Sequence, residues 1–212
     1  MLRDVSIVNN PGTPRVLLCV LFNRNENRIQ GYLEQATNSL LAGAPDRVDI
    51  IGVGWSQGAK GVQDKEAVEH ASDLMTGLTK LQDQIGNRLA AYKKSNTPII
   101  GRPFIFVFPG AIPPNAFYVK SLVSLIEKLK NTGFLGIITQ PDVGTPGSIT
   151  PEQAAAISEY LSVSGGRKRD IVIKPTSYRE VLKWIASAII VMLNNPKDSD
   201  HHLPAPNWFA KK

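Results

Sequence analysis

The sequence contains a single cysteine and only three histidines among its 212 residues. A disulfide within the chain is therefore impossible, which is typical of proteins in a reducing compartment. Zinc sites of the C-x-x-C type are excluded as well, because they need at least two cysteine thiolates. Cys19 lies inside an apolar run, so we expect a small buried side chain at this position.

No apolar run in the sequence is long enough to cross a bilayer. The longest one near the C-terminus, WIASAIIVML at 184–193, is ten residues long, whereas a spanning helix needs about 20. The first residues, MLRDVSIVNNPGTP, carry charge, asparagine and proline, and they lack the apolar core of a signal peptide. We therefore expect a cytoplasmic protein with no membrane partner.

Basic charge is not concentrated in any one region. The formal net charge is +6, and basic residues cluster only at Arg167–Arg169 and at Lys211 and Lys212. Nucleic-acid-binding proteins usually show a basic stripe with interleaved aromatics, or a known motif. We therefore expect no nucleic-acid partner, and a nucleic-acid-associated role through Arg167–Arg169 is the weakest of three interpretations.

Apolar runs of strand length alternate with segments of helical periodicity. Strand-type runs cover residues 16–22, 48–55, 103–108, 134–140 and 170–175. Helical spacing of apolar residues predicts helices over 28–44, 78–95, 115–133, 150–163 and 177–195. This alternation, with continuously apolar strands, predicts a doubly wound α/β fold with a mostly parallel sheet and helices on both faces.

The same pattern predicts a single domain. We expect residues 1–195 to form one α/β domain and residues 196–212 to form a polar, proline-containing C-terminal tail. Residues 56–74 have only weak periodicity and allow a loop, an edge hairpin or a short helix. Gly133 ends the predicted helix at 115–133 and suits a helix C-cap. We expect this to be an outer helix, and it carries Lys128 and Lys130.

Phosphate-binding motifs are absent from the sequence. There is no G-x-G-x-x-G after a predicted strand and no G-x-x-x-x-G-K-[ST]. We therefore expect no cofactor.

The stretch GWSQG, residues 54–58, matches the G-x-S-x-G pattern of a serine hydrolase and follows a predicted strand, as a nucleophile elbow requires. Ser56 would be the nucleophile, Asp142 the acid, and His202 or its neighbour His201 the base. However, the next segment is charged and has no apolar stripe, and both histidines lie in the proline-flanked tail. We keep an α/β serine hydrolase as the alternative function and expect that Ser56 is not a nucleophile.

Three asparagines at alternate positions, Asn23, Asn25 and Asn27, follow the first apolar run. In an open α/β sheet, ligands usually bind where a central strand ends. Asparagine also caps helices and forms turns. Three in alternation exceed that need, and a helix cap plus two polar turn residues is kept as the alternative.

The order of the segments resembles the von Willebrand factor A (vWA) domain, in its short bacterial stand-alone type found with tellurium-resistance and stress-response gene sets. The resemblance covers about residues 14–194 and is carried by the stretches VLLCVLFNRNENRI, VDIIGVGWSQGA, TGLTKLQDQIGNRL, RPFIFVFPGAIPPN and YREVLKWIASAIIVML. In that family a metal site takes D-x-S-x-S after the first strand, a threonine from G-G-T-x-L, and an aspartate from T-D-G after the central strand.

The resemblance places Asn23, Asn25 and Asn27 on D-x-S-x-S, Thr79 on the threonine, and Pro109 and Gly110 on the aspartate and glycine. Both carboxylates of the family's metal site are then missing. Mg²⁺ prefers hard oxygen ligands and is usually bound with at least one carboxylate. The resemblance therefore implies a degenerate site that holds no metal.

Since the vWA family mediates protein–protein contact, the resemblance implies a non-catalytic, metal-independent adaptor in a bacterial multiprotein stress-response or defence system. The partner is expected to be another protein that docks on the loops at the carboxyl ends of the strands. The candidate binding residues are Asn23, Arg24, Asn25, Asn27, Ser56, Thr79, Pro109, Gly110 and Ile112.

Overall fold

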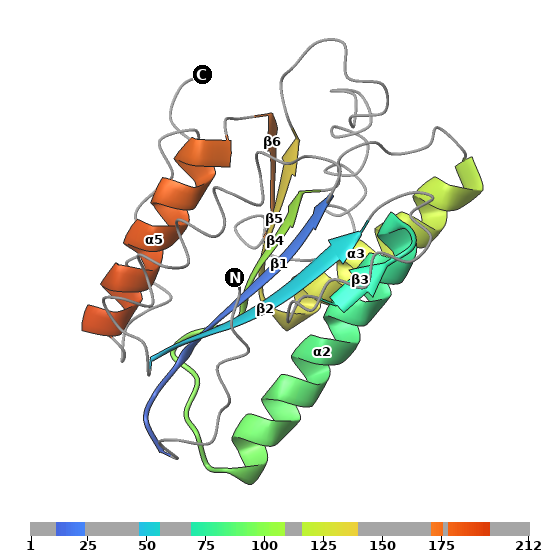
Figure 1. Ribbon diagram of the computed structural model, residues 1–212. Coiled ribbons are helices and arrows are strands. Elements are labelled where there is room, and N and C mark those ends of the chain that lie inside the picture. The colour runs from blue at the N-terminus through green and yellow to red at the C-terminus, as the bar shows by residue number, and fades with distance from the viewer. Residues whose placement is uncertain are drawn as a thin grey trace.

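A six-stranded sheet forms the centre of the computed structural model, which describes residues 12–23, 47–55, 69–108, 116–139, 171–175 and 178–195 (Figure 1). The strand order is β3-β2-β1-β4-β5-β6, and every pairing between neighbours is parallel. This confirms the predicted doubly wound α/β class.

Five of the six strands lie where the apolar runs predict them, with ends shifted by one residue at most. The strands are β1 (Val16–Asn23), β2 (Val48–Trp55), β3 (Glu69–Ala71), β4 (Phe104–Phe108), β5 (Phe134–Thr139) and β6 (Ile171–Pro175). The additional strand is β3, which lies within the weakly periodic segment 56–74. It pairs parallel with β2, from Val53↔Glu69 to Trp55↔Ala71, so it is an edge strand and not the second arm of a hairpin.

The described helices are α2 (Leu74–Lys94), α3 (Ala116–Thr132) and α5 (Tyr178–Asn194). Helix α2 begins four residues before the predicted start at residue 78, because Asp73 caps it by accepting a 2.8 Å hydrogen bond from the Thr76 amide. The predicted helices over 28–44 and 150–163 and the tail at 196–212 lie outside the described residues.

The unbroken apolar run of β1 follows from burial on both faces of the sheet. Leu17, Cys19 and Leu21 pack in the core beneath α2 and α3. The alternate residues of β1 pack in a second core beneath α5, on the opposite face (Figure 1). Cys19 is buried as expected, and burial, together with the charge of Asp49, raises the pKa of its thiol, so it stays protonated in the core.

An aromatic cluster fixes α5 on its face of the sheet. Trp184 of α5 packs edge-on against Phe104 and Phe106 of β4, with ring centroids 6.3 and 6.1 Å apart, and its ring lies 5.6 Å from that of Phe134 of β5. Contacts between aromatic rings at such distances add about 0.5–1.5 kcal/mol beyond the buried area. These contacts therefore hold α5 over β4 and β5.

Helices α2 and α3 end in different ways, and α2 ends in a left-handed residue. Asn96, just after α2, has a left-handed φ of 50°. The Thr97 and Asn96 amides donate back to the carbonyls of Tyr92 and Lys93 over 2.9 and 3.4 Å. This is a Schellman motif with asparagine in the position where glycine is commonest.

Helix α3 ends at Thr132, next to the predicted cap Gly133, but not through a left-handed glycine. Among the described residues only Gly12, Gly101 and Asn96 have positive φ. A Cβ on Gly133 would lie 2.2 Å from the carbonyl oxygen of Pro103, which accepts the Phe134 amide over 2.9 Å. Glycine is needed here because two backbone segments come into contact.

Candidate functional site

The strand order places a topological switch point between β1 and β4. These strands are neighbours, but β2 lies on the far side of β1 and β5 on the far side of β4, so the chain leaves them in opposite directions. In open α/β sheets, ligands bind outside the carboxyl ends of the strands at such a point. Asn23 closes β1, and its neighbour Phe22 pairs with Phe108, the last residue of β4. The candidate site therefore lies at this edge, where the first of the three asparagines is found.

Asn23 is buried, with 7% of its surface exposed, at the carboxyl end of a central strand. A buried side-chain amide is stable only when its polar atoms are hydrogen-bonded. The side chain thus supplies polarity, but not the anionic ligand that a divalent cation prefers.

Trp55, the last residue of β2, lies opposite Asn23 in the parallel register. It is 4% exposed, and its indole nitrogen is buried without a hydrogen-bond acceptor in the described part of the chain. An indole N–H can only donate, so within the described ranges this donor is buried and unsatisfied. Sequence reasoning missed Trp55, because an apolar residue ending an apolar strand carries no signal of an unpaired donor.

The N-terminus of α2 lies against the carboxyl ends of β1 and β2. A Cβ on Gly77 would be 2.9 Å from Leu21 Cδ1 and 3.5 Å from Trp55 Cβ, so glycine lets the first turn approach both strands closely. Asp73 accepts bonds of 2.8 Å from the amide and from the hydroxyl of Thr76. The first turn of α2 is therefore fixed beside Trp55.

Asp73 accepts a further hydrogen bond of 3.0 Å from the hydroxyl of Ser72. Burial alone would raise the pKa of Asp73, but the hydrogen bonds from Thr76 and Ser72 outweigh it and hold that pKa below its ordinary value. Asp73 is therefore an ionised carboxylate whose oxygens already accept hydrogen bonds from its own neighbours.

Thr79 lies in the second turn of α2 and is exposed. Its hydroxyl donates to the carbonyl of Met75 over 3.0 Å, within the helix. Thr76 is the threonine nearest the start of the helix, one turn before Thr79. The assignment of Thr79 to the metal-site threonine stays a prediction.

Most other predicted site residues lie outside the described residues: Arg24, Asn25, Asn27, Ser56, Pro109, Gly110, Ile112, Asp142 and His202. The position of Ser56 in the chain is still informative, because it directly follows β2. β2 is the second strand from one edge of the sheet, and the short strand β3 is the edge strand. Ser56 therefore follows a strand other than the two that form the switch point.

Within the described ranges, no three histidine, cysteine, aspartate or glutamate side chains come together as a metal site would require. In the same ranges, no helix has both the length and the apolar character needed to cross a membrane. A scan against protein-family models and a search of curated proteins both find no match.

Proposed function

We propose that the protein is a non-catalytic interaction module of vWA type that binds another protein at the carboxyl ends of its strands. The observation that carries the proposal is the buried amide of Asn23 at the end of β1, next to the switch point. The family pattern has a metal-binding carboxylate at this position, and an uncharged amide supports contact without a metal.

The surroundings of Asn23 support docking by hydrogen bonds. The Trp55 indole N–H beside it is buried without an acceptor in the described ranges, and Asp73 and Thr76 hydrogen-bond to one another. A partner that brings a carboxylate or carbonyl would reach this N–H only through a local movement. Arg24, the next residue in the chain, adds a planar fork of N–H groups that suits a carboxylate.

The setting of this interaction follows from the sequence resemblance. We place the protein in the bacterial cytoplasm, as an adaptor in a multiprotein stress-response or defence system. The strand order supports this function over a serine hydrolase, since Ser56 directly follows β2 in the chain and β2 is not one of the two strands that form the switch point.

Pull-down from the native host tests the proposal. The test variant combines Arg24→Glu with Ile112→Asp, which changes the charge and the apolar contact of the proposed docking loops. The matched control is Lys93→Glu with Lys128→Glu, two exposed residues on α2 and α3. Lys130, on the same predicted outer helix as Lys128, is unsuitable because it is only 5% exposed. It follows the buried Ile126 by four residues, so it lies on the inward side of α3.

Loss of the partner in the test variant alone would support docking at the strand ends. Retention of the partner by a folded test variant, with loss in the control, would contradict it and place the partner on the helices. Circular dichroism and thermal unfolding of both variants ensure that a folding defect is not counted as lost binding.

A further inference from the structure

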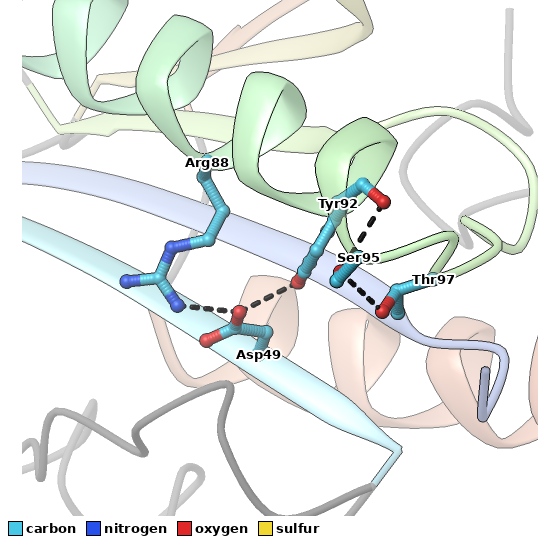
Figure 2. A network of polar contacts seen from close by, with 5 residues as sticks. All are labelled: Asp49, Arg88, Tyr92, Ser95 and Thr97. Carbon is cyan, nitrogen blue, oxygen red and sulfur yellow. Dashed lines mark hydrogen bonds and ion pairs between the residues drawn. The ribbon is translucent and has the colours of Figure 1, made fainter. Parts of the chain in front are cut away.

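A buried polar network lies at the amino ends of the strands, opposite the candidate site, under the C-terminal half of α2 (Figure 2). Asp49, the second residue of β2, is 1% exposed. Its Oδ2 accepts hydrogen bonds of 2.5 Å from Arg88 Nη1 and 2.6 Å from the hydroxyl of Tyr92. Arg88 and Tyr92 are four residues apart on α2, so both project from the same helix face onto the strand (Figure 2).

One atom of the Asp49 carboxylate is left over. Its Oδ1 is buried and has no hydrogen-bond partner among the described residues. A buried carboxylate oxygen without a donor destabilises the fold by about 1–3 kcal/mol or more, because it has lost its water. The carboxylate is thus paired on one side only.

Among the described residues, Arg15 has buried hydrogen-bond donors without acceptors, whereas Asp49 has a buried acceptor without a donor. Arg15 is 1% exposed, and its Nε and Nη1 are buried without acceptors in the described ranges. Its backbone pairs with Pro98 and Ile100 on one side of β1. Its side chain lies on the same sheet face as Leu17, two residues on, and Leu17 is the register partner of Asp49.

The charge of Arg15 reaches the same network. It acts on the hydroxyl of Tyr92, where it partly offsets the effects that raise the pKa of that phenol. The guanidinium cannot lose its proton to escape burial, because arginine stays charged in proteins. Unpaired donors on Arg15 and an unpaired acceptor on Asp49 therefore lie near one phenol.

We propose that an ordered water molecule binds between Arg15 and Asp49, accepting a hydrogen bond from the guanidinium and donating one to Oδ1. A buried water typically makes about three hydrogen bonds to groups that are otherwise unsatisfied, and these two residues supply donors and an acceptor together. Asp49 is then the shared anion of two guanidinium groups, and the water joins β1 to β2 and α2.

A bound anion would satisfy Arg15 but not Asp49. It would be repelled by Oδ1, since like charges at short range disfavour each other. It would also face the C-terminus of α2, which carries a partial negative charge. Water is the ligand that satisfies both orphaned groups.

The water site has a consequence for the far end of α2. The helix has 21 residues and is therefore about 30 Å long. Its C-terminal half is held on β2 by Asp49, and its first turn carries Asp73 and Thr76 at the candidate site. The network thus contributes to the position of the helix start beside Trp55.

The experiment is a high-resolution crystal structure of the full chain, with crystals grown in chloride and soaked in bromide. We expect a peak within about 2.7–3.2 Å of both an Arg15 nitrogen and Asp49 Oδ1, without anomalous signal from bromide. An anomalous bromide peak at this position would show an anion site and overturn the proposal. A direct bond between Arg15 and Oδ1, with no intervening peak, would also overturn it.

A solution measurement covers the case in which crystals do not form. In nitrogen-edited NMR spectra of the wild-type chain, we expect a cross-peak from the Nε–H of Arg15 to a long-lived water. Arg47 is the matched control, because its Nη2 donates directly to the carbonyl of Leu193 over 3.0 Å. An Arg15 Nε–H that shows no water contact, or no more than Arg47 shows, would contradict a bound water.

Discussion

Tyr92 and Asp49 are 43 residues apart in the chain, yet a 2.6 Å hydrogen bond joins the phenol of one to the carboxylate of the other. The bond connects the last turns of α2 to the start of β2 (Figure 2). Since Asp49 is fully buried, the stability of this contact depends on Tyr92 staying protonated.

Alkaline pH should weaken the fold through Tyr92. Burial, followed by the hydrogen bond and the charge of Asp49, raises the pKa of Tyr92 above its ordinary value of 10.0. Because the folded pKa is raised, the stabilisation is complete below about pH 10 and is lost as the pH rises towards the folded pKa. Denaturant unfolding should show wild type losing up to about 1.4 kcal/mol per pH unit above pH 10 relative to Tyr92→Phe. A parallel decline of both proteins would show that Tyr92 is not responsible.

Alanine at two helix-associated glycines should have opposite effects. Gly133→Ala places a methyl group against the Pro103 carbonyl and should destabilise the protein by about 2–3 kcal/mol. Gly86→Ala is the matched control, because Gly86 is an exposed position of α2 with nothing within 4 Å of a new Cβ. It should stabilise the protein by about 0.5–1 kcal/mol. Urea unfolding measures both, and a neutral Gly133→Ala would mean that the corner between α3 and β5 can move apart.

Substitutions of Asn96, the left-handed residue after α2, should change the stability of the protein. Asn96→Gly should stabilise the protein by a few tenths to about 1 kcal/mol, because glycine adopts positive φ without steric cost. Asn96→Ala should destabilise it by about 1 kcal/mol for the opposite reason. Thermal unfolding of the pair is the measurement. Equal melting temperatures for the glycine and alanine variants would show that the left-handed cap does not contribute.

Divalent metal should bind weakly or not at all. The proposed degenerate site has Asn23 and Pro109 where the family has its two carboxylates, and Asn25 and Asn27 where the family has serines. Calorimetric titration with Mg²⁺ and then Mn²⁺ should give no saturating isotherm. A clear micromolar isotherm that disappears in Asn23→Ala would show that the amide oxygens do bind the ion.

Ser56 should not react as a nucleophile. This prediction rests on the charged segment that follows GWSQG and on the position of His202 in the C-terminal tail. A fluorophosphonate probe should leave the folded protein unlabelled, as it should leave Ser56→Ala. Stoichiometric labelling that is abolished by Ser56→Ala would favour the serine hydrolase instead.

The strands were predictable because their signal is local. β1 and β4 are buried on both faces, so every residue is apolar and the run itself marks the strand. β3 was missed because three residues at a sheet edge give too short a pattern to recognise. The start of α2 was placed too late, since its first turn is set by the cap at Asp73 and not by the apolar spacing.

The candidate site was only partly predictable. Asn23 could be found, because a polar residue ending a central strand is visible in the sequence. Trp55 could not, since its unpaired N–H depends on what surrounds the indole. The same holds for Arg15 and Asp49, whose burial beneath α2 leaves atoms unpaired.

The sequence by itself determined the α/β class, the places of five strands, and the lack of a disulfide, because composition and hydrophobic period act over a few neighbouring residues. Only the tertiary structure decided that β4 lies beside β1, that β3 forms the edge, and that Arg88 and Tyr92 meet Asp49. These relationships join residues 16 or more positions apart, and they depend on how helices and strands pack together. No local pattern encodes which distant side chain will be buried against which.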